Sequence, residues 1–308
     1  MVRIEPLEPG GPRPLANRDP GDAWVVAPDG TRYWGRFGAA GLLALDAEGR
    51  VLLQHRVSWS HFGDTWALPG GARHEGESAC GGALREAREE AGVPVGAIRP
   101  RLLSVFDLGY WTYTTLVGDA VVPFEPRITD PESRELAWVP ADEVDARPLH
   151  PGFADSWRML RRELSRRPAV VVDAANVVGS VPDGWWRDRA GAAEKLLSRL
   201  AAIDREGLPA AALELPEHTW FPEWTVVLEG QARGAADVPT DAGEAASAVR
   251  VVRAPGEGDD TIAAEAAALV EAGREVTVVT GDRELAGRAA DAGAAVRGPR
   301  WLLDLLPA

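Results

Sequence analysis

Cysteine is almost absent from this 308-residue chain, and it contains no long apolar run. The one cysteine, Cys80, excludes an internal disulfide and a metal site built from several thiolates, as is typical of a reducing compartment. No stretch approaches the roughly 20 apolar residues of a membrane helix, and the Pro- and Gly-rich N-terminus lacks the apolar core of a signal peptide. We therefore expect a cytoplasmic protein without a membrane partner, in which residues 1–19 form a flexible tail.

Basic residues are also few, because 33 Lys and Arg stand against 47 Asp and Glu, for a net charge of −14. This balance argues against a broad basic face for duplex nucleic acid, although it leaves room for a local basic groove. With 45% hydrophobic and 26% charged residues, the composition is that of a globular protein. The length is about twice that of a common domain, so we expect two domains.

The apolar pattern changes near residue 166. Residues 20–165 contain short alternating runs separated by turns, with one acidic helical segment among them, which predicts a mixed α+β arrangement. In residues 168–308, short β-branched runs alternate with helical stretches, which predicts a parallel sheet covered by helices on both faces. These two ranges are the predicted domains.

The acidic segment places Glu86, Glu89 and Glu90 at helical positions i, i+3 and i+4, so three carboxylates share one face. A solvated acidic face is one interpretation. The other is a platform for Mg²⁺ or Mn²⁺, because like charges at this spacing repel and a divalent cation removes that repulsion. Gly71, just upstream, allows the backbone to come close to an ion or ligand.

The spacing of these residues resembles a known family. Gly71, Glu77, Arg85-Glu86, Glu89-Glu90 and Gly92-Val93 match every fixed position of the Nudix box, GX5EX7REUXEEXGU, where U is an aliphatic residue. Ala87 occupies the inner aliphatic position with its smallest option. The resemblance implies an α/β/α sandwich with a mixed sheet over residues 20–165.

The resemblance also implies a reaction, the hydrolysis of a nucleoside diphosphate linked to a group X by water attack on phosphorus with Mg²⁺ or Mn²⁺. Carried over by position, Glu86, Glu89 and Glu90 hold the metal with the Gly71 carbonyl as a further ligand, and Glu77 pairs with Arg85. The general base stays open among Glu89, Glu90 and, outside the box, Glu135. The substrate also stays open: nucleoside triphosphates, oxidised or modified nucleotides, dinucleotides and nucleotide sugars are all candidates. Aromatic residues outside the box offer a stacking surface for a base, and they are Trp59, His61, Phe62, Trp66, Tyr110, Trp111 and Tyr113.

Acidic residues recur at the strand ends of the second half. Asp173, Glu229 and Asp282 each follow a β-branched run, and Asp259 and Asp260 begin a helical stretch. Since ligands bind at the carboxyl ends of parallel strands, these side chains can form a metal-dependent phosphodiesterase site. The alternative is that they are helix caps and local turns.

This half resembles the NYN group of PIN-like nuclease domains. Asp173 with Asn176, the acidic pair Asp259-Asp260, and Thr280 with Asp282 match that pattern, whereas Ala174-Ala175 and Glu229 depart from it. The resemblance implies metal-dependent RNA cleavage, and two tryptophans with two arginines in residues 183–191 suit single-stranded bases.

The sequence thus predicts a Nudix pyrophosphohydrolase fused to a NYN/PIN-like domain. One rival holds that the main activity is that of an endoribonuclease, with the Nudix domain serving a nucleotide signal or an RNA end. A second rival is a module that senses a nucleotide without turnover. The oligomeric state stays open.

Overall fold

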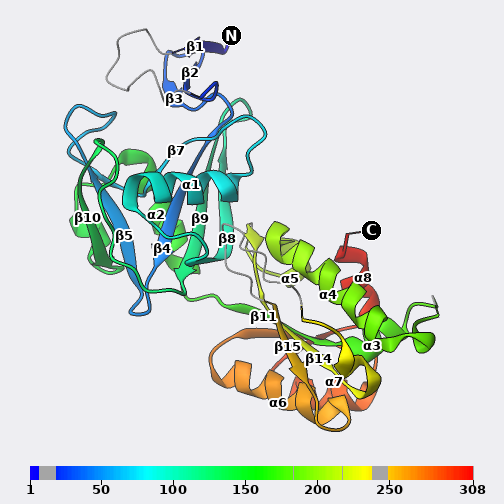
Figure 1. Cartoon of the computed structure of the whole chain (residues 1–308). Coiled ribbons are helices and arrows are strands. Elements are labelled where there is room, and N and C mark those ends of the chain that lie inside the picture. Colours follow the sequence, from blue (N-terminus) through cyan, green and yellow to red (C-terminus); the bar gives the residue numbers. More distant parts are fainter. Residues whose placement is uncertain (7–18, 183, 217, 238–248, 308) are drawn as a thin grey trace. The chain divides into compact units, whose positions relative to one another are not determined.

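The computed structural model describes residues 1–6, 19–182, 184–216, 218–237 and 249–307. The described chain forms two compact units, which meet in sequence between Leu164 and Ser165, and each is described by itself (Figure 1). Most of the expected N-terminal tail, residues 7–18, falls outside the described residues. Among the helices in the described ranges, not one combines the length and the apolarity needed to cross a bilayer.

A mixed sheet forms the centre of unit 1, in the order β10-β5-β4-β9-β8. Its strands are β4 (Ala39–Leu45), β5 (Arg50–Arg56), β8 (Ile98–Asp107), β9 (Thr112–Ala120) and β10 (Ser133–Pro140). β4 and β9 run parallel and the other neighbours run antiparallel, so the mixed sheet predicted from the sequence is confirmed. Two short strands, β6 (Trp66–Ala67) and β7 (Gly70–Ala72), pair with β5 and β4.

Helices cover this sheet, with α1 (Ala79–Ala91) in front of the strands and α2 (Pro151–Glu163) behind them in Figure 1. Helix α1 begins at Ser78, whose side chain accepts the Gly81 N–H, and ends at Gly92 in the left-handed conformation. Its inner face carries alanines, including Ala83 and Ala87, which are fully buried in the same cluster as Leu42 of β4. Small side chains let the helix backbone approach the sheet closely, which brings the glutamates of α1 to the strand ends.

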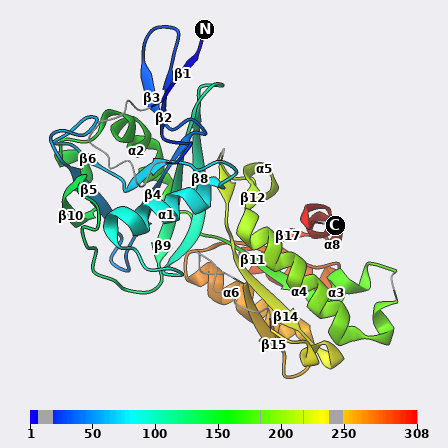
Figure 2. The same ribbon diagram turned by 45° about the horizontal axis from the view of Figure 1, so that its top comes forward.

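Three further strands, β1 (Arg3–Pro6), β2 (Ala23–Val26) and β3 (Arg32–Trp34), form a separate antiparallel sheet at one end of unit 1 (Figure 2). The structure therefore differs from the expected tail at Arg3–Pro6, which pairs with β2. An ion pair between Glu5 and Arg32 at 2.8 Å links the first strand to the third.

Unit 2 contains five parallel strands in the order β15-β14-β11-β16-β17. They are β11 (Pro168–Asp173), β14 (Glu223–Leu228), β15 (Val249–Arg253), β16 (Glu275–Val279) and β17 (Ala295–Arg297). The parallel sheet expected here is confirmed.

Helices pack on both faces of this sheet. Residues of α3 (Ala174–Gly179), α4 (Arg189–Glu206) and α8 (Pro299–Leu305) share one apolar cluster with the strands, and residues of α6 (Gly258–Glu271) and α7 (Arg283–Asp291) share another. Figure 1 shows α4 on one side of the strands and α6 and α7 on the other. The remaining elements are short: β12 (Leu208–Pro209), α5 (Ala210–Leu213), β13 (Thr219–Trp220) and the 3-10 turns η2 (Val144–Ala146), η3 (Trp185–Arg187) and η4 (Gly230–Gly234).

Candidate active site

Strand β7 and helix α1 meet at Gly71. This residue pairs with Ala40 of β4, and a Cβ atom built on it would lie 2.6 Å from the carboxyl carbon of Glu86. Only glycine fits at this contact without moving the carboxylate. The close approach of strand and helix thus fixes where the buried side chain of Glu86 lies.

Arg85 ties the loop before α1 to the helix. Its Nε and Nη2 donate to the two carboxylate oxygens of Glu77 at 2.8 and 3.0 Å, and Nη2 also donates to the Ala72 carbonyl at 2.9 Å. Its Nη1 donates to Glu86 at 2.9 Å and to Glu89 at 3.2 Å. Burial alone would raise the pKa of Glu77, but the hydrogen bonds from Arg85 and from the His74 N–H lower it below its usual value.

Glu90 is the most deeply buried carboxylate of α1, with 3% of the residue exposed. The Gly70 N–H donates to its Oε2 at 2.9 Å. Burial, and then the neighbouring charge of Glu86, raise the pKa of Glu90 well above its usual range. A carboxylate in this setting needs a cation if it is to be ionised.

Two further carboxylates, which the sequence reasoning missed, lie beside Glu90. Ligand oxygens of Glu90, Asp130 and Glu132 all lie within 4.8 Å of one another. The loop that carries them runs along the end of α1, where the Thr129 hydroxyl donates to the Glu89 carbonyl at 2.6 Å. The signal that could have revealed them is the acidic run on either side of Pro131, just before β10.

The structure does not bring Glu135 into this group. Its side chain is 58% exposed and lies 4.0 Å from Nδ1 of His55, which it faces across the pair β10 and β5. Glu132, in contrast, is buried and lies 3.8 Å from the guanidinium of Arg56. Glu89 is exposed at the rim.

The chemistry of these side chains fits a hard divalent cation. Carboxylate oxygens are the ligands that Mg²⁺ and Mn²⁺ prefer in proteins. Glu86, Glu90, Asp130 and Glu132 supply several carboxylates, and burial together with the charge of Glu86 raises the pKa of Glu90, which a bound cation would offset. Metal removal is therefore a meaningful test of this site.

In unit 2, the carboxylate of Asp173 lies at the end of β11 and is part of a local network. It accepts the backbone N–H of Asn176 at 3.0 Å, the Asn176 side-chain amide at 2.7 Å and the Thr280 hydroxyl at 2.8 Å. These bonds cap α3 and join β11 to the end of β16.

The other acidic residues of unit 2 have differing surroundings. Burial, and then the charges of Asp173, Asp282 and Glu229, raise the pKa of Asp259. Asp282 accepts two N–H groups at the start of α7, and Glu229 accepts the Gly258 N–H. Asp260 is 91% exposed and pairs with Arg288 at 2.7 Å. Among the described residues, the group of ligand atoms within 4.8 Å of one another is the one in unit 1.

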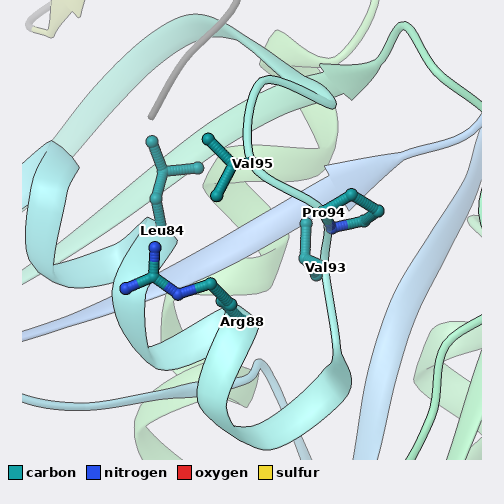
Figure 3. A pocket seen from close by; sticks show the side chains of 5 residues that line it. All are labelled: Leu84, Arg88, Val93, Pro94 and Val95. Carbon is teal, nitrogen blue, oxygen red and sulfur yellow. The ribbon is translucent and has the colours of Figure 1, made fainter. Parts of the chain in front are cut away.

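Two hollows lie near these regions. In unit 1, a hollow of about 10 Å³ lined by Leu84, Arg88 and residues 93–95 lies beside the end of α1 (Figure 3). It holds no more than a water molecule, so it is not a substrate site. In unit 2, an open groove of about 430 Å³ is lined by Asn176, Gly281 and their neighbours.

Comparison with known proteins identifies unit 1. The NUDIX domain family matches residues 35–162. A Mycobacterium tuberculosis (strain CDC 1551 / Oshkosh) protein named "Putative 8-oxo-dGTP diphosphatase 3" is 48% identical over 154 residues, which are 47% of this chain and 70% of that protein. A Bifidobacterium longum protein named "Nucleoside triphosphate pyrophosphatase/Nudix hydrolase fusion protein" is 39% identical over 162 residues, 47% of this chain and 32% of that protein. The crystal structure of a Nudix hydrolase from M. smegmatis, RenU, is 48% identical, covers 46% of this chain and 94% of that chain, and has a TM-score of 0.43.

The chain therefore belongs to the Nudix hydrolase family and is an enzyme that acts on phosphoanhydride bonds. The family match ends at residue 162, before unit 2 begins.

Proposed function

We propose that the chain is a divalent-metal-dependent pyrophosphohydrolase that cleaves a nucleoside diphosphate linked to X. The observation that carries this proposal is the buried Glu90 beside Asp130 and Glu132, with Glu86 held next to it by Arg85. The relative named as an 8-oxo-dGTP diphosphatase makes modified nucleoside triphosphates the first substrates to test.

The residue roles follow from these positions. We assign the metal to Glu86, Glu89 and Glu90 with the Gly71 carbonyl, and we add Asp130 to the same site. When bound, Mg²⁺ or Mn²⁺ neutralises the diphosphate and lowers the pKa of a water molecule. The pair of Glu77 and Arg85 supports this arrangement by holding the loop against α1.

We assign the proton acceptor to Glu132 in preference to Glu135, Glu89 or Glu90. The Glu132 carboxylate lies 3.8 Å from the Arg56 guanidinium, and a carboxylate oxygen of Glu132 lies within 4.8 Å of one of Glu90, beside the proposed metal site. Glu135 is less suited, because its exposed side chain lies beside His55. A general base has to reach the attacking water, which favours the carboxylate inside the group.

The test is chromatography of products after the chain meets Mn²⁺ and a panel of 8-oxo-dGTP, dGTP, a dinucleotide and a nucleotide sugar. We expect a nucleoside monophosphate from the unmutated chain and none from Glu90→Gln. Glu48→Gln is a matched control, since Glu48 lies in the exposed turn between β4 and β5 and pairs with Arg50. Equal turnover by Glu90→Gln would overturn the proposal, and tight nucleotide binding without any product would favour the sensing module.

A second activity is supported by one observation in unit 2. Asp173 ends β11, Glu229 directly follows β14, Asp282 precedes α7 and Asp259 lies in the first turn of α6, and this placement supports a metal-dependent ribonuclease site of the NYN/PIN-like kind at the carboxyl ends of the strands. The groove beside Asn176 adjoins this edge, and Trp185 lies near Gly179 in its lining. Single-stranded RNA, with bases stacked on tryptophan, is the proposed partner.

Cleavage of a fluorescent single-stranded RNA in Mn²⁺ tests this second activity. We expect Asp173→Asn to abolish cleavage and Asp291→Asn, at the far end of α7, to leave it unchanged. Cleavage that persists in Asp173→Asn would rule out this site as its source.

A further inference from the structure

Four rings from three segments of unit 1 form an aromatic cluster, which we define as Trp24, His61, Phe62 and His150. The ring centroids of His61 lie 5.2 Å from Trp24 and 4.2 Å from Phe62, and Phe62 lies 4.8 Å from His150. All three contacts are edge to face, with interplanar angles of 64 to 81°. The Arg32 guanidinium lies over the Trp24 ring at 5.3 Å, whereas the exposed Phe62 ring leaves surface for another planar group.

Phe62 is exposed and strained within this cluster. It is 46% exposed and has a φ of 54°, a left-handed conformation that a bulky residue rarely adopts. Asp64 in the same loop has a φ of 57°. Strained backbone of this kind gathers at ligand-binding sites, where the surroundings hold it in place. An exposed ring held in a strained loop indicates a binding role.

The two histidines make the cluster neutral at pH 7. Burial, and then the charges of Arg56 and His61, lower the pKa of His150 to about 4, and burial followed by Arg56 and Arg32 lowers that of His61. Nδ1 of His150 accepts the Gly152 N–H at 3.2 Å, so the neutral ring carries its proton on Nε2. A neutral aromatic surface with such a donor suits a nucleobase better than it suits a phosphate.

Arg56 joins this cluster to the proposed metal site. Its Nε donates to the His61 carbonyl at 3.3 Å, and its Nη2 lies 3.8 Å from the Glu132 carboxylate. Glu132 in turn lies within 4.8 Å of Glu90. A single arginine side chain therefore separates the aromatic cluster from the carboxylates.

Trp66, another aromatic candidate of this region, has its ring covered. Trp66 is buried, with His55 stacked on its ring at 4.8 Å and the Arg147 guanidinium over it at 4.1 Å. Its two contacts occupy the ring, whereas Phe62 keeps nearly half of its surface open.

We propose that the aromatic cluster binds the nucleobase of the substrate, with Phe62 stacking on the base and His150 donating to one of its acceptor atoms. This inference rests on the proposed function, because it places the base of the same nucleotide whose phosphates meet the carboxylates. It goes further by naming the residues that select a base over any other group.

The experiment is calorimetric titration of the 308-residue chain, without metal, with guanosine monophosphate and with ribose 5-phosphate. We expect the unmutated chain to bind the nucleotide more tightly than the sugar phosphate. In Phe62→Gly, which removes the ring and relieves the positive φ, the nucleotide Kd should rise about tenfold or more, since stacking on an aromatic ring contributes on that scale. Phe62→Tyr should restore binding, and Val122→Ala, an exposed apolar residue beyond the far end of β9, should leave it unchanged.

Equal nucleotide affinity in Phe62→Gly and the unmutated chain, or no nucleotide binding at millimolar concentration, would overturn the inference. Hydrolysis by the same preparations separates it from the proposed function. If the chain hydrolyses a nucleotide but Phe62→Gly binds it as tightly as the unmutated chain does, the inference is wrong and the proposed function stands. If Phe62→Gly weakens nucleotide binding but the unmutated chain hydrolyses no nucleotide, the proposed hydrolysis is wrong and the inference is supported.

Discussion

Replacement of Arg85 by Gln should destabilise α1 strongly. The Arg85 side chain is only 10% exposed, and it donates to the partly buried carboxylate of Glu77, to the buried carboxylate of Glu86 and to the Ala72 carbonyl. Its loss leaves two carboxylates without their cation, for which the expected cost is about 3–5 kcal/mol. The contact with Glu89 adds little, because that side chain is more than half exposed. Typical domains are stable by about 5–15 kcal/mol, so much of the stability of unit 1 depends on this side chain.

Hydrogen exchange of the amides in α1, followed by mass spectrometry, measures this cost locally. Arg85→Gln should lower the free energy of opening of α1 by about 3–5 kcal/mol. Arg85→Lys should give a value between those of the unmutated chain and Arg85→Gln, since lysine keeps the charge but not the planar guanidinium. Arg88→Gln is the matched control, because Arg88 is exposed on the same helix. An exposed ion pair contributes at most about 1 kcal/mol. If the opening free energies of Arg85→Gln and Arg88→Gln differ by no more than that, the reasoning is refuted.

Further predictions concern the carboxylates. Gly71→Ala should lower kcat about 100-fold, because its Cβ displaces Glu86; steady-state kinetics with an unchanged kcat would contradict this. Glu132→Gln should lower kcat by about 100-fold or more while Glu135→Gln stays close to the unmutated chain, and the opposite order would return the base to Glu135. The Mn²⁺ concentration for half activation should rise as the pH falls, because the pKa of Glu90 is raised and the cation has to displace its proton; an unchanged midpoint would count against Glu90 as a ligand. Asp173→Ala should destabilise unit 2 by about 1–3 kcal/mol, because Thr280 and Asn176 lose a buried acceptor, and urea unfolding measures this loss.

The regular elements were predictable where the apolar pattern was strong. All six residues of β11 are buried, and a continuous β-branched run of this kind is typical of a parallel strand covered on both faces. The glutamates of α1 could also be placed, because helical spacing alone puts Glu86 and Glu90 on one face.

The contacts between distant segments could not be predicted. Asp130 and Glu132 reach Glu90 because their loop bonds to the end of α1. The acidic residues on either side of Pro131 are visible in the sequence, but the path of their loop to α1 is not. Strand β1 was missed for a similar reason, since four residues with little apolar pattern become a strand only by pairing with β2. The aromatic cluster likewise contains residues from three places in the chain. The periodicity of a single helix or strand does not indicate that such residues lie together.

Anomalous diffraction from crystals soaked in Mn²⁺ with a non-hydrolysable nucleoside triphosphate tests the central claim most directly. The account predicts manganese bound by the carboxylates of Glu86 and Glu90, with the phosphates of the nucleotide at the same place. Manganese bound only by the acidic residues of unit 2, with the carboxylates of α1 empty, would contradict it.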